Sequence, residues 1–372
     1  MEYFPWHLGV FDAHCHPTDF MRNISIIPQM KTRCLTIMAS REEDQSLVFQ
    51  AASTYGVNCK ADLGEETPNR RVIPCFGWHP WFSHMLYDDT NMSIDITVDR
   101  DFKINHYKSV LVPGPEDISF IDSLPNPRSL KAFLRETKTY LEAFPTALVG
   151  EIGLDKSFRI PLKWSLENEC SRNTDITPGT REGRCLSQYH VHMNHQKAVF
   201  RAQLQLAAEM RRPVSVHGVQ AHGAVFDTFQ DLWKEHTKKK SRSNRKKTIA
   251  QKTNQEMQTP VIESSTPYPP RICLHAYSGP VEFLNQYLDP KIPADIYFSF
   301  CALLNLPTDK VIEVIKAVPE NRILVESDFD KASDNMDQLL EKMCRRICDD
   351  KQWSLEKGVE ILGNNWRRFI FS

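Results

Sequence analysis

The sequence lacks several features that would assign a chain to a class of protein at once. No stretch approaches about 18 uninterrupted apolar residues, the length that a spanning helix needs, so we expect no membrane association. The first residues, MEYFPWHLGVFDAHCH, have neither a basic start nor a long apolar run, so we expect no secretory signal. The ten cysteines include no CxxC pair, which argues against a zinc ribbon or a redox dithiol and favours reduced thiols. We therefore expect a cytoplasmic location, a nuclear location, or both.

A strong charge of either sign is also absent. Lys and Arg number 46 against 47 Asp and Glu, a formal net charge of -1 at pH 7. The whole molecule therefore has no general attraction to nucleic acid, and such an attraction must come from a local cluster. The run KKKSRSNRKK at 238–247 is one such cluster, with seven cations in ten residues. An import signal, a DNA contact and a solvated loop all remain open as its role.

Strand-like and helix-like segments alternate along the chain. Apolar, β-branched runs predict eight strands, at 9–14, 33–39, 71–77, 146–152, 213–217, 271–275, 295–300 and 322–327. Apolar residues spaced by three and four predict helices, at 44–56, 128–143, 189–210, 222–236, 280–288, 308–317, 333–350 and 354–369. Strands that are apolar throughout indicate a parallel sheet buried on both faces. Eight such units predict an α/β fold of the (β/α)8 TIM barrel type, in preference to a doubly wound sheet with one switch point.

Three insertions interrupt this alternation, at 83–126, 156–188 and 237–270. The first is acidic and contains a few strand-like runs, and the second is polar with Pro, Gly and Asn punctuation. The composition of the third cannot bury enough apolar surface to order itself, so we predict a mobile loop there. We expect one domain over 1–372, with the insertions as long loops at the C-terminal face of the barrel.

Six residues of the metal-ligand type stand at the ends of predicted strands. They are His14 and His16 in VFDAHCHP, Glu151 in VGEIGLD, His217 in PVSVHG, His275 in ICLHAYSG and Asp328 in ILVESDFD. The functional groups of a TIM barrel gather at the carboxyl ends of its strands, and imidazoles with carboxylates suit Zn²⁺, Mn²⁺, Fe or Ni. Packing alone does not explain six such residues at one topological position, so we predict a metal-dependent hydrolase.

The first ion is predicted to bind between residues of the first and the eighth predicted strands. Alternation along a strand turns His14 and His16 to the same side, so both can chelate one ion. Asp328 could bind the same ion and act as the catalytic base, since metal coordination lowers the pKa of a bound water towards neutrality.

The second ion is predicted to share a carboxylate with the first. Glu151 can bridge two cations with its two oxygens, and His217 and His275 could hold the second ion with it. A salt-bridged core carboxylate is the alternative for Glu151, and either histidine alone would be an ordinary structural residue.

The predicted third strand ends in CFGWHP, which supplies candidate substrate contacts. His79 is predicted to contact a substrate phosphate and not a metal ion. Trp78 and Trp81 could stack on a base, although forming the wall of the pocket is the commoner role. Asp155, in the GLD that follows Glu151, is expected to be structural.

These motifs together resemble the TatD family of metal-dependent hydrolases, and the long insertions resemble those of a fungal branch of that family. The resemblance rests on DAHCHPTDF, FGWHPW, VGEIGLD, HQKAVFRAQLQLAAEMRRPVSVHG, LHAYSG and ILVESD, in order from about residue 10 to 330, with a closing GNNWRRFIF. It implies a TIM barrel, one or two divalent ions (Zn, Mg or Mn) and 3′–5′ deoxyribonuclease or other phosphodiesterase activity. The ligands that it implies are His14, His16, Glu151, His217, His275 and Asp328.

The chain departs from the family pattern around the substrate. The family has an arginine shortly after the fifth-strand histidine, whereas this chain has Gly218, Val219 and Gln220 after His217. Trp81 stands where the family has the second histidine of GxHPH. Because a phosphate-pairing cation is missing, two alternatives to a DNase remain: hydrolysis of a small amide or ester, and a protein-interaction factor that docks partners on its inserted loops.

Overall fold

The computed structural model describes residues 3–64, 66–93, 96–164, 169–170, 172–234, 268–305 and 310–372. The basic run at 238–247 and nearly all of the third predicted insertion lie outside the described residues. The prediction of a mobile loop therefore stays a prediction.

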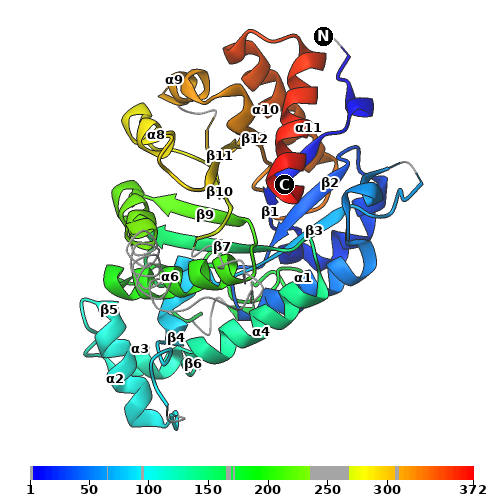
Figure 1. Ribbon diagram of the computed structural model, residues 1–372. Coiled ribbons are helices and arrows are strands. Elements are labelled where there is room, and N and C mark those ends of the chain that lie inside the picture. Colours follow the sequence, from blue (N-terminus) through cyan, green and yellow to red (C-terminus); the bar gives the residue numbers. More distant parts are fainter. Residues whose placement is uncertain are drawn as a thin grey trace, which may run out of the picture.

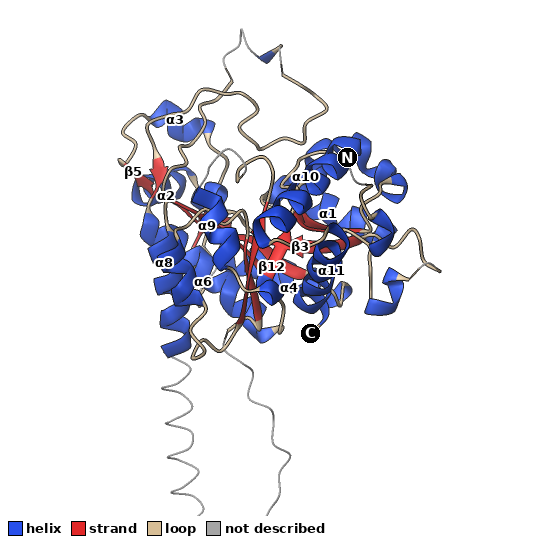
Figure 2. Cartoon of the chain, turned by 90° about the horizontal axis from the view of Figure 1, so that it is seen from above, coloured by secondary structure: helices blue, strands red, loops and turns tan. Residues whose placement is uncertain are grey.

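Eight parallel strands form one sheet in the order β1-β2-β3-β7-β9-β10-β11-β12. They are β1 Phe11–Cys15, β2 Cys34–Met38, β3 Val72–Phe76, β7 Leu148–Asp155, β9 Val214–Val219, β10 Arg271–Leu274, β11 Asp295–Phe300 and β12 Ile323–Val325. The sheet curls until its end meets its beginning: the Asp328 N–H donates to the His14 carbonyl at 3.0 Å, and the His16 N–H to the Phe329 carbonyl at 2.8 Å. The strands lie inside a ring of helices (Figures 1 and 2), and the predicted TIM barrel is confirmed.

Helices connect the strands and cover the outside of the barrel. They are α1 Glu42–Tyr55, α4 Leu130–Ala143, α6 Met193–Glu209, α8 Val281–Tyr287, α9 Lys310–Ala317, α10 Asp334–Lys351 and α11 Leu355–Phe371, together with helical residues 222–234 and the 3-10 segment η2 Pro17–Gln29. Every helix that the apolar spacing predicts is present within a few residues. The last of them, α11, packs on β1, where the Trp366 ring stacks on Phe11 with centroids 4.5 Å apart. Among the described helices none is long and apolar enough to cross a bilayer.

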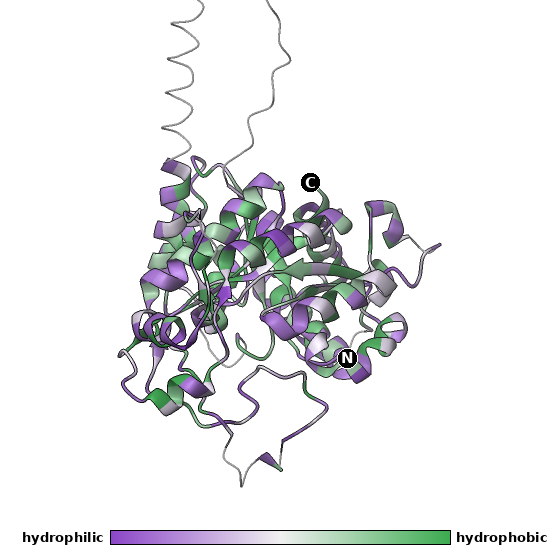
Figure 3. Ribbon diagram, turned by 90° about the horizontal axis from the view of Figure 1, so that it is seen from below, coloured by the Kyte–Doolittle hydropathy of each residue, from purple (hydrophilic) through white to green (hydrophobic). Residues whose placement is uncertain are grey.

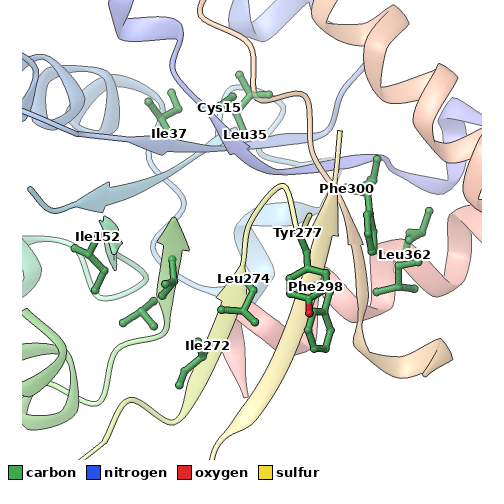
Figure 4. Packing of buried hydrophobic residues seen from close by; sticks show 14 of the residues in the cluster. Cys15, Leu35, Ile37, Ile152, Ile272, Leu274, Tyr277, Phe298, Phe300 and Leu362 are labelled. Atoms are coloured by element: carbon green, nitrogen blue, oxygen red, sulfur yellow. The ribbon is translucent and has the colours of Figure 1, made fainter. Parts of the chain in front are cut away.

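The strand residues are buried on both faces, as their continuous apolar character predicts. Figure 4 shows Ile152 of β7, Ile272 and Leu274 of β10, and Phe298 of β11, which belong to one cluster of buried residues. Each large apolar side chain buried in this way contributes about 1.5–3 kcal/mol. The hydropathy colouring in Figure 3 follows the same division, with apolar strands inside and polar outer faces on the helices.

The first insertion differs from its prediction, because it is mainly helical and not strand-like. It contains α2 Arg100–Val110 and α3 Ile118–Ser123, with only the two-residue strands β4 Leu86–Tyr87 and β5 Leu111–Val112; β4 pairs with β6 Arg128–Ser129, just beyond the insertion. Asp99 and Asp117 cap the two helices, accepting from the N–H groups of Phe102 and Ser119 at 2.8 Å. N-terminal caps of this kind satisfy helix donors locally, and the apolar spacing alone did not reveal them.

The three insertions do not join the barrel at the same end. The first two leave from the carboxyl ends of β3 and β7. The third connects helical residues 222–234 with the start of β10 at Arg271. A helix-to-strand connection of this kind enters a barrel strand at its amino end, so the described flanks of the third insertion lie opposite the first two.

Candidate metal centre

The carboxyl ends of the strands surround a cavity of about 600 Å³. Five of the six predicted ligands line this cavity, and they are His16, Glu151, His217, His275 and Asp328. The sixth, His14, lies directly beneath and is fully buried. His79 and Trp81 also line the cavity. The fold therefore brings together side chains that lie far apart in the sequence.

The buried carboxylate of Glu151 stands at the centre of this group. Its Oε1 lies 2.8 Å from His275 Nε2, 3.0 Å from His217 Nδ1 and 3.1 Å from His79 Nε2. Its Oε2 lies 3.4 Å from His16 Nε2 and 3.5 Å from His14 Nε2. The two oxygens thus face two separate sets of nitrogen atoms, which we call the Oε1 side and the Oε2 side.

The Oε2 side has the dimensions of a four-ligand metal site. The Nε2 atoms of His14 and His16 are 3.1 Å apart, and they lie 3.8 Å and 3.7 Å from Asp328 Oδ1. Tetrahedral ligands with bonds of about 2.1 Å are separated by about 3.4 Å from one another. The spacing of His14, His16 and Glu151 therefore fits a divalent ion, and Asp328 Oδ1 is close enough to both imidazoles to be a fourth ligand.

The Oε1 side offers a triangle of ligand atoms. His217 Nδ1 and His275 Nε2 are 3.3 Å apart, and both contact Glu151 Oε1. His79 is different, because its Nδ1 accepts the Trp81 N–H at 3.1 Å. Its proton is therefore on Nε2, which makes His79 a hydrogen-bond donor and leaves two histidines and one carboxylate oxygen as ligands.

Comparison with known proteins decides the family. The family model described as TatD related DNase matches residues 11–371 of this chain. The chain belongs to the TatD-related DNase family. The resemblance drawn from the motifs is thereby confirmed, and this is a family of metal-dependent hydrolases.

Relatives of this TatD chain match it along nearly their whole length. Cut9-interacting protein scn1 of Schizosaccharomyces pombe is 34% identical over 365 residues, covering 97% of this chain and 98% of the relative. The uncharacterized deoxyribonuclease YMR262W of Saccharomyces cerevisiae is 28% identical over 378 residues, with 96% and 98% covered. The crystal structure of YJJV, a TatD homologue from Escherichia coli, has a TM-score of 0.53 at 15% identity, covering 97% of each chain, and so shares the fold.

Buried polar groups outside the ligand set hold this TatD site in place. Asp12 accepts the N–H groups of His14 and Ser327, each at 3.0 Å, and so ties β1 to the segment that carries Asp328. The Nδ1 of His14 lies 2.8 Å from Ser215 Oγ. Gly153 is required for close approach, because a Cβ there would lie 2.0 Å from the His217 carbonyl oxygen. The imidazoles are therefore oriented by the strands themselves.

The electrostatics of the site favour an ionised bridge. Burial by itself would raise the pKa of Glu151, but the imidazoles around it, His79 first, hold that pKa well below its usual range. Burial raises the pKa of Asp328 to about 6, against the opposing effect of His275 and His16. A divalent ion bound beside Asp328 would lower that pKa and leave the carboxylate ionised, which is the form that can accept a proton from water.

Sequence reasoning missed Glu326, which is buried behind the Oε1 side. Its Oε1 accepts the Ala276 N–H at 2.6 Å and lies 3.7 Å from His275 Nδ1. Its Oε2 has no hydrogen-bond partner. Ligand atoms of His14, His275 and Glu326 lie within 4.8 Å of one another, so this carboxylate adds negative charge beside the imidazoles. The glutamate two residues before Asp328 was the available signal.

Sequence reasoning also missed Arg41, the one arginine or lysine among the described residues that line the cavity. All five of its N–H donors are engaged by carboxylate, hydroxyl or carbonyl oxygens of Asp19, Asp44, Ser40, Thr177 and Pro178. Arg41 therefore holds the second insertion against the barrel rim and offers no free donor to a ligand. It does not replace the arginine that is missing after His217.

Trp78 does not reach the cavity. Its ring is 1% exposed, packs edge-on against Phe133 with centroids 5.1 Å apart, and donates its Nε1–H to the Phe82 carbonyl at 2.8 Å. A side chain enclosed in this way cannot stack on a bound base. The substrate-stacking hypothesis for Trp78 is therefore corrected to a structural role, whereas Trp81 remains in the cavity wall.

Proposed function

We propose that this chain is a divalent-metal-dependent phosphodiesterase that releases nucleotides from DNA ends, acting as a single domain over 1–372. The observation that carries the proposal is the position of Glu151, whose two carboxylate oxygens each face a different set of imidazoles. A carboxylate that bridges two ligand sets is the arrangement of two-metal hydrolases. The relative named as a deoxyribonuclease supports DNA as the substrate class.

In this proposal His14, His16, Glu151 and Asp328 would hold one Zn, Mg or Mn ion, and Glu151, His217 and His275 would hold a second. Bound ions would polarise a phosphoryl oxygen and lower the pKa of water. Asp328 accepts the proton of the attacking water, and Glu151 keeps the two ligand sets in register. His79 donates its Nε2–H to a phosphate oxygen, and Trp81 forms the wall beside it.

Neutralisation of the phosphate falls on the ions and on His79. Among the described residues that line the cavity, Arg41 is the one permanent cation, and its donors are already used. A phosphodiester therefore depends on the metal ions for most of its charge compensation. This predicts a strict requirement for metal and a short bound segment of substrate.

The test combines metal analysis with an assay on labelled single- and double-stranded DNA. We expect the purified protein to contain a divalent metal and to release nucleotides from ends, with both properties reduced in His14→Ala and Asp328→Ala. The matched control is His7→Ala, at an exposed position away from the cavity, which should change neither property. Metal without release of nucleotides would exclude the DNase and favour hydrolysis of a small amide or ester.

A second candidate function follows from the name of the relative that is 34% identical, Cut9-interacting protein scn1. We propose that this chain also binds a protein partner, with the first two insertions as the docking surface, in the cytoplasm, the nucleus or both. Affinity capture from cells should then recover the same partner with wild type and with Asp328→Ala. Loss of the partner in a variant with shortened inserted loops would assign the surface, and its full retention would exclude it.

A further inference from the structure

One carboxylate outside the ligand set connects the cavity wall to a single ligand. Asp155, at the end of β7, is buried, and its Oδ2 accepts two side-chain hydrogen bonds. The His217 Nε2–H donates to it at 3.0 Å, and the Trp81 Nε1–H donates to it at 2.6 Å. Trp81 follows β3 and His217 lies in β9, so Asp155 connects these two segments.

The other oxygen of Asp155 is used as well. Oδ1 accepts the backbone N–H groups of Ser157 at 2.7 Å and Phe158 at 2.9 Å, which shape the first turn of the second insertion. The Asp155 backbone is fixed from behind, because its N–H donates to Gln196 Oε1 at 2.9 Å and its carbonyl accepts from Gln196 Nε2 at 2.8 Å. With the Ser157 Oγ–H, which donates to Oδ1 at 2.8 Å, five donors hold the carboxylate in one orientation.

This arrangement fixes the tautomer of His217. An ionised carboxylate accepts hydrogen bonds only, so the proton of a neutral His217 must be on Nε2. The lone pair is then on Nδ1, the atom that lies 3.0 Å from Glu151 Oε1 and 3.3 Å from His275 Nε2. Carboxylates that orient a ligating histidine in this way strengthen metal binding by about 10- to 100-fold.

We infer that Asp155 and Trp81 are positioning residues for the Oε1-side metal ion: Asp155 holds His217 in the tautomer that can bind metal, and the Trp81 indole holds Asp155. The inference rests on the metal-dependent function proposed above. It assigns Trp81 a role through its Nε1–H that differs from stacking on a substrate. It also predicts that the two metal ions respond differently to change, because neither Asp155 nor Trp81 contacts a ligand on the Oε2 side.

The test is calorimetric titration of metal-free full-length protein with Zn²⁺. Two reference variants assign the binding events: His217→Ala removes the Oε1-side event, and His14→Ala removes the Oε2-side event. Asp155→Asn should weaken the Oε1-side event about 100-fold, because the amide N–H then donates to Nε2 and moves the proton to Nδ1. Trp81→Phe should weaken the same event about 10-fold. The Oε2-side event should stay within twofold in both.

A second measurement separates positioning from loss of folding. At a Zn²⁺ concentration that fills the wild-type site, nitrogen-15 NMR should show His217 protonated on Nε2 alone in wild type and still protonated on Nδ1 in Asp155→Asn. The control is Phe158→Leu, which removes a ring stacked on Trp81 at 4.6 Å but keeps the indole donor, and it should leave Zn²⁺ affinity unchanged. Wild type that binds no metal would overturn the proposed function itself. Two outcomes would overturn this inference alone, provided that the wild type binds metal. One is an Oε1-side event that is unchanged in Asp155→Asn, and the other is the absence of any binding event that His217→Ala removes.

Discussion

Two groups of buried or half-buried histidines, one in the cavity and one beside the first insertion, differ in what surrounds them. The cavity group, His14, His16, His79, His217 and His275, surrounds the carboxylate of Glu151. The outer cluster consists of His84 in η4 Pro80–Met85, His106 in α2 and His195 in α6. There the His106 Nε2–H donates to the His84 carbonyl at 2.7 Å, and the His195 Nε2–H to the Ser83 carbonyl at 2.9 Å.

The difference shows what turns buried histidines into a metal site. In the cavity the imidazoles surround one anion, and their pKa values move in both directions: nearby carboxylates outweigh burial for His16, whose pKa rises to about 9, whereas burial lowers that of His79 to about 4. In the outer cluster burial lowers all three pKa values, with that of His84 falling to about 3. Within the described residues, no group of three ligand atoms within 4.8 Å includes an outer-cluster histidine. The shared carboxylate is therefore what distinguishes the cavity group, as a candidate metal site, from the outer cluster.

The largest expected effect comes from removing that carboxylate. Glu151→Gln keeps the side-chain volume but loses the negative charge that the imidazoles share. The cavity group should then lack a common anionic ligand, as the outer cluster does. We expect both metal-binding events to be lost and nucleotide release to fall about 10⁴-fold, as for residues that act as a unit. Metal analysis and the DNA assay measure this. Glu142→Gln, at an exposed position on α4, is the matched control. Full metal content in Glu151→Gln would contradict the bridging role.

Most of the fold and the ligand set could be predicted from the sequence because both depend on local patterns. A parallel strand buried on both faces is apolar throughout, and barrel topology brings every strand end to one rim. His14, Glu151 and Asp328 could therefore be placed together without any knowledge of their distances. The eight strands were found for the same reason.

The remaining features depend on contacts between segments that no local pattern predicts. Arg41 is held by Thr177 and Pro178, whose position depends on the path of the second insertion. The hydrogen bond from Trp81 to Asp155 was missed because the two residues lie 74 positions apart in sequence. The outer cluster was missed because His106 belongs to α2, in a segment where the sequence suggested strand-like runs.

A smaller effect is expected on the stability that metal binding adds, which should depend on the cavity group and not on the outer cluster. A ligand that binds only the folded state adds about 2.7 kcal/mol to the free energy of unfolding at 100 times its Kd. We expect Zn²⁺ to raise the urea midpoint of the wild type, and chelation to reverse this. His84→Gln should keep the full increase, whereas His14→Ala should lose a large part of it. An increase that disappears in His84→Gln would place a metal in the outer cluster instead.

The smallest effect is the response of the outer cluster to acid. Burial, with the neighbouring His106 and His195, depresses the pKa of His84 from an ordinary value of 6.5 to about 3, and burial lowers that of His106 to about 4. Between these values and pH 6.5 the unfolded chain binds protons that the folded chain does not, so the free energy of unfolding falls as the pH falls. The contribution is complete above pH 6.5 and is lost progressively towards pH 3.

Replacing one histidine of the outer cluster should therefore flatten this dependence. One proton bound only by the unfolded state changes the free energy of unfolding by about 1.4 kcal/mol per pH unit. We expect urea unfolding of the metal-free protein between pH 4 and 6 to show a weaker dependence of the free energy of unfolding on pH in His84→Gln, by up to about 1.4 kcal/mol per pH unit. The replacement breaks no hydrogen bond at the Nδ1 atom of His84, which has no partner. His7→Gln, at an exposed position, should keep the wild-type slope. Equal slopes in wild type and His84→Gln would show that His84 is protonated in the folded protein, and the contrast between the two histidine groups would then fail.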